Sequence, residues 1–300
     1  MLIQSNKRTK GLLWLLLFST LAPLFAHSYL GLYVRFLADD YCYSAKATSM
    51  GIMGYVIHYY KSWSGRFSEG FFETFMSQFE STFFYNSFFL IFLWIIVLTI
   101  IIRIVIPRDQ LNWAYAPLLI AVTILFSLFD LLPDYHIRRI INDVSHTWDK
   151  YPAVLQSIYW ISGRHSLIPP LILSTFLVGL ITYFSRGEYH LKDKPYLLVM
   201  SCIIAFVSGG FSETFVVLQT TSLCFSLLLL IYFGSTALKK RLLHLVIPVL
   251  FFSILAMVIV VMAPGNKIRA TFFPQTPDPL ELVQIAFMHL KQFLYLTLKW

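Results

Sequence analysis

The stretch that decides the fold is residues 243–262, LHLVIPVLFFSILAMVIVVM, which contains no Asp, Glu, Lys or Arg. An α-helix needs about 20 apolar residues to cross about 30 Å of hydrocarbon, and this stretch has that length. Comparable apolar segments cover 11–34, 83–106, 113–133, 166–185, 196–212 and 214–233, and another begins near residue 281. The sequence therefore predicts an all-α fold, a polytopic transmembrane helical bundle of about seven or eight spans.

The composition of the whole chain agrees with a membrane protein. Its 300 residues are 58% apolar and 13% charged, whereas soluble domains carry about 25% charged residues. The net charge of +8 is therefore not a sign of nucleic-acid binding. The three cysteines, Cys42, Cys202 and Cys224, predict neither a disulfide framework nor a metal site. Residues 1–300 are expected to form a single membrane domain with the lipid bilayer as its surroundings.

The loops predict the orientation of this domain. Lys and Arg near the ends of spans stay on the cytoplasmic side, and short basic clusters such as 7–10 and 239–241 fall on one side if the N-terminus is inside. We expect a multi-pass plasma (inner) membrane protein with a cytoplasmic N-terminus and an uncleaved first segment as anchor. The last segment runs to Trp300 without a flanking charge cluster or polar tail, so a longer chain is expected. The long polar loops then lie outside.

The first outer loop, residues 35–80, opens with two adjacent carboxylates, Asp39 and Asp40, beside an apolar segment. Burial and the proximity of a like charge raise a carboxyl pKa, so one of the pair could serve as a base near neutral pH. The alternative is a solvated pair that caps a helix beginning at about Tyr41.

Farther along this loop, aromatic residues between Tyr43 and Tyr60 predict one or two helices at the membrane interface. Arg66, Glu69 and Glu73 follow at spacings that share one helix face. They form either an intrahelical charge triad or a guanidinium held for a phosphate.

Charged residues recur at other predicted outer boundaries. Arg164 and His165 precede the span at 166–185, either as a snorkelling boundary arginine or as a contact to a lipid phosphate. Glu213 lies in a tight hairpin, 208–214, and an acid so close to hydrocarbon is expected to be paired or functional. Lys267 and Arg269 follow a Pro-Gly-Asn turn, as an anion site or a basic boundary cluster.

Several activities have no support in the sequence. There is no Walker motif, no G-x-G-x-x-G after a strand and no H-E-x-x-H, so ATP, nicotinamide and zincin chemistry are not expected. His136, His146 and His165 are too scattered to predict a zinc site. We expect no cofactor, and the sequence leaves open whether a divalent cation binds at Asp39 and Asp40.

Four short motifs resemble the GT-C class of integral-membrane glycosyltransferases. In that class an acidic pair opens the first outer loop, often with a Tyr three residues on, as in Asp39-Asp40-Tyr41-Cys42-Tyr43. The other three look like motifs of a bacterial branch of such multi-pass proteins, and they are Trp63-Ser64-Gly65-Arg66-Phe67, Gly210-Phe211-Ser212-Glu213 and Pro264-Gly265-Asn266 with Arg269.

The resemblance implies a transferase that uses a polyprenyl-phosphate-linked sugar and an envelope acceptor, a glycan, a lipid or a protein, on the extracytoplasmic face. It implies that Asp39 is the base and that Asp40 orients it or binds a metal. The residues expected to contact substrate are Tyr43, Trp63, Arg66, Arg164, His165, Glu213, Lys267 and Arg269. A transporter or flippase for a lipid-linked sugar, and a non-catalytic partner in envelope synthesis, are the alternatives.

Overall fold

The computed structural model describes residues 39–77, 87–105, 160–186, 194–272 and 278–298, together with isolated positions between 11 and 33. Within these ranges every regular element is an α-helix, so the all-α prediction is confirmed for the described chain. The span predicted at 113–133 and most of the one at 11–34 lie outside the described residues.

Three described helices are long and apolar enough to cross a membrane: α7 (Ile161–Ser185), α9 (Glu213–Phe233) and α10 (Thr236–Val261). Apolar stretches in α4 (Ser87–Val105) and α8 (Pro195–Gly209) are shorter. α12 (Pro279–Leu298), where an eighth span was predicted, is not one of the three. The transmembrane helical character is thus supported, whereas the count of seven or eight spans stays a prediction.

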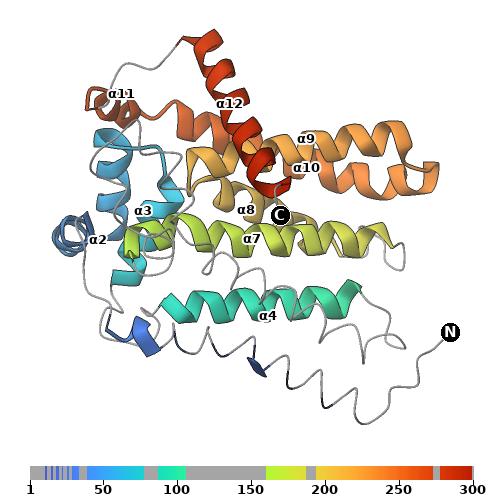
Figure 1. The fold of residues 1–300 in the computed structure, drawn as a ribbon, viewed down its shortest axis with the longest axis horizontal. Coiled ribbons are helices and arrows are strands. Elements are labelled where there is room, and N and C mark those ends of the chain that lie inside the picture. The colour runs from blue at the N-terminus through green and yellow to red at the C-terminus, as the bar shows by residue number, and fades with distance from the viewer. Residues whose placement is uncertain are drawn as a thin grey trace.

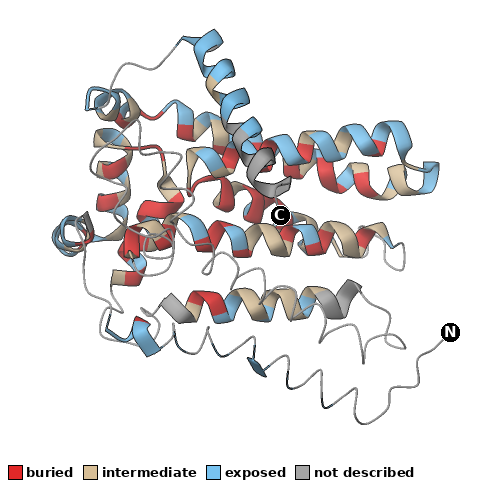
Figure 2. Cartoon of the chain, viewed as in Figure 1, coloured by how far each residue is buried: buried red, intermediate tan, exposed pale blue. Residues whose placement is uncertain are grey.

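The apolar helices lie along one direction and form a bundle (Figure 1). α10 packs against both α8 and α9, α7 packs against α8, and α4 packs against α7. The core contains fully buried small and branched side chains such as Ala205, Leu245 and Val249. The outward faces of α9 and α10 are exposed (Figure 2) and carry large apolar residues, including Leu218, Phe225 and Phe251. Such an apolar exterior is expected of helices that face lipid.

Inside the bundle, one buried polar network joins three helices. The Gln219 amide of α9 donates to the Ala205 carbonyl of α8 at 2.8 Å and to Ser253 Oγ of α10 at 2.9 Å. Ser208 Oγ donates to the Gln219 side-chain oxygen, and the hydroxyls of Thr220 and Ser253 are 2.8 Å apart. Because each of these polar groups is satisfied, the network can hold the helices together within an apolar environment.

One end of the bundle is covered by α2 (Asp39–Ser62), α3 (Phe67–Ser77) and α11 (Pro264–Ala270) (Figure 1). α2 changes direction at Gly51, whose φ of 69° lies in the left-handed region, where glycine is favoured. The helices expected in the first outer loop therefore exist, although their position at a membrane interface stays a prediction. At this same end α7 begins, α8 ends, α9 begins and α10 ends.

Candidate functional site

The three later motifs, far apart in the sequence, meet at this end of the bundle. The connection between α2 and α3 contains Gly65, whose N–H donates to Asn266 Oδ1 of α11 at 3.3 Å. The N–H of Ser68, in the first turn of α3, donates to the Gly210 carbonyl at 3.0 Å. Gly210 belongs to the predicted hairpin, which the structure confirms between the end of α8 and the start of α9.

Two glycines make this close approach of backbones possible. A Cβ on Gly65 would overlap the Val260 carbonyl at the end of α10, and a Cβ on Gly265 would overlap the backbone of Trp63 and Ser64. Any other residue at position 65 would push the end of α10 away from the connection between α2 and α3, and any other residue at position 265 would push α11 away from it. The glycines thus set the distance between Arg66 and Arg269, which lie on the two segments.

The Glu213 carboxylate is the centre of the site. Arg66 Nε donates to Glu213 Oε2 at 2.6 Å, and an Arg269 guanidinium nitrogen donates to Oε1 at 3.1 Å. Ser64 Oγ also donates to Oε1, at 3.1 Å. Glu213 was expected to be either paired or functional, and the structure confirms that it is paired. Arg66 and Arg269 are two of the cations predicted from the sequence to contact an anion, so the structure brings these two residues together with Glu213.

Trp63 and Lys267, which were also predicted to contact substrate, lie in this region and differ in their surroundings. The Arg269 guanidinium lies 5.9 Å from the centroid of the Trp63 ring, within the range of a cation–π contact. Lys267 is exposed on α11, the short helix that also carries Arg269.

A second carboxylate lies deeper, on the inner side of Arg66. Glu69 is buried, and one of its oxygens is 3.4 Å from an Arg66 nitrogen and accepts a hydrogen bond of 3.5 Å from the Tyr59 hydroxyl. Burial raises the pKa of Glu69 to about 7, although Arg66 opposes the shift. The Tyr43 ring packs edge-on against Tyr59, with 5.9 Å between centroids, so this predicted residue contacts the tyrosine whose hydroxyl donates to Glu69.

Of the acidic pair that opens α2, Asp40 has a structural partner. Its side chain is buried, and Oδ1 accepts hydrogen bonds from the Ser162 N–H at 3.0 Å and from Ser162 Oγ at 2.6 Å. Asp40 therefore caps the first turn of α7, where a carboxylate is favoured by the helix dipole. The helix α2 begins at Asp39, two residues before the predicted start. The side chain of Asp39 lies outside what the structure describes.

Glu73, on α3, is a second buried carboxyl group near Arg66. It is buried, and neither carboxyl oxygen has a hydrogen-bond partner among the described residues. Burial, and then the nearby Glu69, raise its pKa well above the usual range. An unpaired charge would be costly here, so the uncharged, protonated form is favoured.

Arg164 and His165 lie inside α7 and not before it, because the helix begins at Ile161. Both side chains are 1% exposed. The His165 ring packs edge-on against Phe72 of α3, with 5.1 Å between centroids. This burial argues against the interpretation of Arg164 as a snorkelling boundary residue, since such a side chain reaches out to water.

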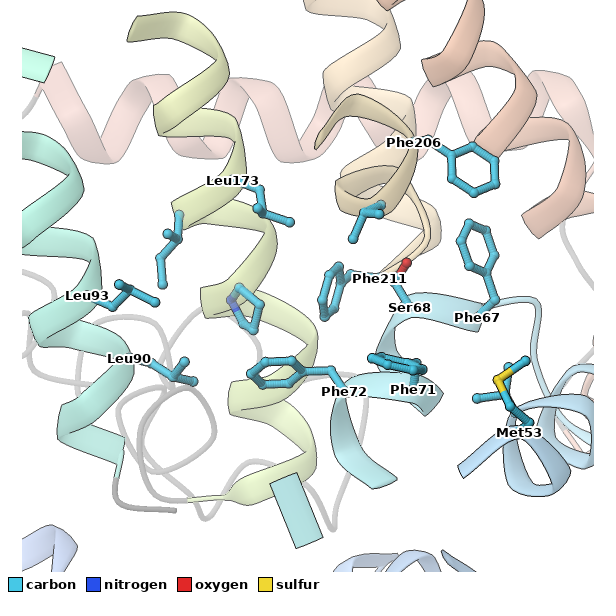
Figure 3. Close-up of a pocket in the computed structure, with 14 residues that line it drawn as sticks. Met53, Phe67, Ser68, Phe71, Phe72, Leu90, Leu93, Leu173, Phe206 and Phe211 are labelled. Atoms are coloured by element: carbon cyan, nitrogen blue, oxygen red, sulfur yellow. The ribbon is translucent and has the colours of Figure 1, made fainter. Parts of the chain in front are cut away.

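An apolar cavity of about 530 Å³ adjoins the charged cluster. Phe67 and Ser68, which follow Arg66 directly, line it together with Phe71 and Phe72 of α3 (Figure 3). The other walls come from α2, α4, α7 and α8 and the hairpin after α8: Met53, Val56, Leu90, Leu93, Pro169, Ile172, Leu173, Phe206, Val207 and Phe211. Ser68 is the one polar side chain of this lining. The cavity suits a hydrocarbon ligand.

In the described ranges, no group of three or more His, Cys, Asp or Glu side chains is placed to hold a metal ion. Since Asp39 is not among the described side chains, a divalent cation at the acidic pair stays a prediction. Comparison with protein-family models, with curated proteins and with solved structures finds no match for this chain.

Some members of the site could not be singled out from the sequence. Ser64 lies within a recognised motif, but nothing marked its hydroxyl as a donor to Glu213. Ser162 and Tyr59 carried no signal, because their partners Asp40 and Glu69 are identified only when α7 and α3 pack against α2. Glu69 and Glu73 were placed on the face of Arg66, and their burial is the new information.

Proposed function

We propose that this chain is a membrane glycosyltransferase that transfers a sugar from a polyprenyl-phosphate-linked donor to an envelope acceptor on the extracytoplasmic face. The observation that supports it most is that the Arg66–Glu213–Arg269 cluster lies at one end of a bundle of apolar helices, where Phe67 and Ser68, which follow Arg66 directly, line an apolar cavity. A ligand with a phosphate and a hydrocarbon tail matches both features.

The charges of the cluster favour an anionic ligand. Arg66 and Arg269 are positive, and Glu213 and Glu69 are the acids paired with them, while Lys267 adds an exposed positive charge on the helix that carries Arg269. Because the pKa of Glu69 is about 7, this acid is only partly ionised near neutral pH. The cluster as a whole is therefore net positive, which favours a phosphate at the membrane boundary.

The basic residues at the opposite end of the bundle support the proposed topology. Arg186 follows α7, and Lys194 precedes α8. The first turns of α10 contain Lys239, Lys240 and Arg241. If this end is cytoplasmic, as the positive-inside rule favours, the charged cluster faces the extracytoplasmic side and the N-terminus is cytoplasmic in a plasma-membrane protein.

The reaction needs two things from the protein. A base takes the proton of the acceptor hydroxyl as its oxygen attacks the anomeric carbon, and we assign this role to Asp39. The bond between the anomeric carbon and the phosphate oxygen breaks, and its electron pair stays on the phosphate, where Arg66 and Arg269 stabilise the new charge. Asp40 holds the beginning of α2 against α7 and so positions its neighbour Asp39.

The test is an assay of the purified chain in lipid nanodiscs with a polyprenyl-phosphate hexose radiolabelled in the sugar. We expect time-dependent transfer of label to acceptor and release of polyprenyl phosphate, with Arg66→Ala strongly reduced. The matched control is Glu281→Gln, which removes a charge from an exposed position on α12. Unconsumed donor would contradict the proposal. Movement of intact donor across a liposome bilayer would support the transporter alternative instead.

A further inference from the structure

Three donors from two segments converge on the carboxylate of Glu213. They are the Arg66 guanidinium at 2.6 Å, the Arg269 guanidinium at 3.1 Å and the Ser64 hydroxyl at 3.1 Å. Two guanidiniums and a hydroxyl are also the groups that bind a phosphate well, because carboxylate and phosphate both present anionic oxygens to planar donors. The Glu213 carboxylate therefore occupies the place that a ligand phosphate requires.

Exposure indicates which member of the cluster can leave. The Glu213 side chain is 35% exposed, against 29% for Arg269 and 22% for Arg66. The carboxylate consequently regains water with the smallest rearrangement. Glu213 is also the first residue of α9, so a rotation of its side chain need not disturb the helix. The arginines, by contrast, are held by Trp63 and by Glu69.

Resting on the function proposed above, we propose that Glu213 is a stand-in for the phosphate of the lipid ligand and is displaced when that phosphate binds between Arg66 and Arg269. In the ligand-free chain the carboxylate keeps the two guanidiniums apart from each other and correctly spaced. On binding, the phosphate takes over the hydrogen bonds of Arg66, Arg269 and Ser64, and the Glu213 carboxylate turns to solvent.

This exchange has a consequence for the transfer reaction. The donor carries a phosphodiester with one negative charge, and breakage of the bond to the anomeric carbon leaves a phosphate monoester with an additional charge. The monoester is the stronger competitor for the two guanidiniums. Displacement of Glu213 is therefore more complete as the leaving group forms, and the arginines are released to the phosphate when its charge is greatest.

The experiment measures binding of farnesyl phosphate to the purified chain in detergent by calorimetry, with farnesol as the uncharged control. Glu213→Gln keeps the shape of the side chain and removes the competing charge, so it should tighten farnesyl phosphate binding by about tenfold and leave farnesol binding unchanged. Glu281→Gln, an exposed charge removal on α12, should leave both unchanged. Ser64→Ala weakens the hold on Glu213 and also removes a ligand donor, so its effect should be small.

The outcomes separate this inference from the proposed function. If Arg66→Ala and Arg269→Ala abolish farnesyl phosphate binding but Glu213→Gln weakens it in a chain with an unchanged melting temperature, the displacement is refuted and the phosphate site stands. If farnesyl phosphate binds no more tightly than farnesol, and neither arginine matters, the phosphate site itself fails. Should Glu213→Gln not fold, Glu213→Asp, with its shorter side chain and weaker hold on the arginines, should also tighten binding, and weaker binding would overturn the inference.

Discussion

Replacement of Asp40 tests whether this residue is a structural anchor and not the base. Asp40→Ala removes two hydrogen bonds to Ser162, one at 2.6 Å from its hydroxyl and one at 3.0 Å from its N–H, in a site where Asp40 is 3% exposed. Hydrogen bonds to a charged group contribute about 1.5–3 kcal/mol each. We therefore expect the free energy of unfolding to fall by at least about 3 kcal/mol.

The Ser162 hydroxyl allows its own bond to be separated from the rest. Ser162→Ala removes the hydroxyl bond of 2.6 Å, whereas the backbone N–H of residue 162 still donates to Asp40 Oδ1. In a double-mutant cycle with Asp40→Ala, the coupling energy should be about 1.5–3 kcal/mol. The matched control is Ser226→Ala, because the Ser226 hydroxyl is exposed and bonds only within its own helix.

The assay is thermal unfolding of the purified variants in one detergent, followed by intrinsic fluorescence. Asp40→Ala should melt well below the wild type, Ser162→Ala should lie between them, and the double variant should melt close to Asp40→Ala. Strictly additive losses of Asp40 and Ser162 would refute the reasoning, since additivity means that the two side chains do not interact.

Three further predictions concern charge, packing and topology. Folded Glu69 has a pKa of about 7, above the ordinary 4.5, so the folded chain binds more protons between these values and its stability should fall as pH rises from about 4.5 to about 7. Between pH 5 and pH 8 the melting temperature of Glu69→Gln should fall by less than that of the wild type. An equal fall in both proteins would contradict the raised pKa. Gln219→Leu breaks hydrogen bonds to α8 and α10 and should cost about 1–2 kcal/mol in thermal unfolding, whereas an unchanged melting temperature would show that the network does not hold the bundle. Cys42 is exposed while Cys202 is buried, so an impermeant maleimide should label Cys42 in intact spheroplasts; labelling only after permeabilisation would invert the proposed orientation.

The helices were the most predictable part of the molecule. The predicted spans 214–233 and 243–262 correspond to α9 and α10, because apolar runs bounded by turns or charges determine a span locally. The start of α7 was placed five residues too late, at 166 instead of Ile161. Arg164 and His165 were taken to precede the span, but they lie inside α7 and neighbouring helices bury them, and such burial is not visible in a local pattern.

The pairings within the site could not be predicted from the sequence. Glu213 was expected to have a partner, yet Arg66 is 147 residues away and Arg269 is 56 residues away. Asp40 and Ser162 are separated by 122 residues. Contacts at these separations depend on how the helices pack, so charge and spacing could nominate Arg66, Glu213 and Arg269 but could not predict that they share one carboxylate.

The transfer rate of Asp39→Asn tests the central claim most directly. Asn keeps the volume of Asp but cannot take a proton, and loss of a general base typically slows a reaction by about 10²–10⁴-fold. We predict that Asp39→Asn loses sugar transfer by this amount while it retains the melting temperature of the wild type and its binding of farnesyl phosphate. The matched control, Asp278→Asn, alters an exposed acid before α12 and should transfer normally. Wild-type transfer rates in Asp39→Asn would contradict the glycosyltransferase account at this site.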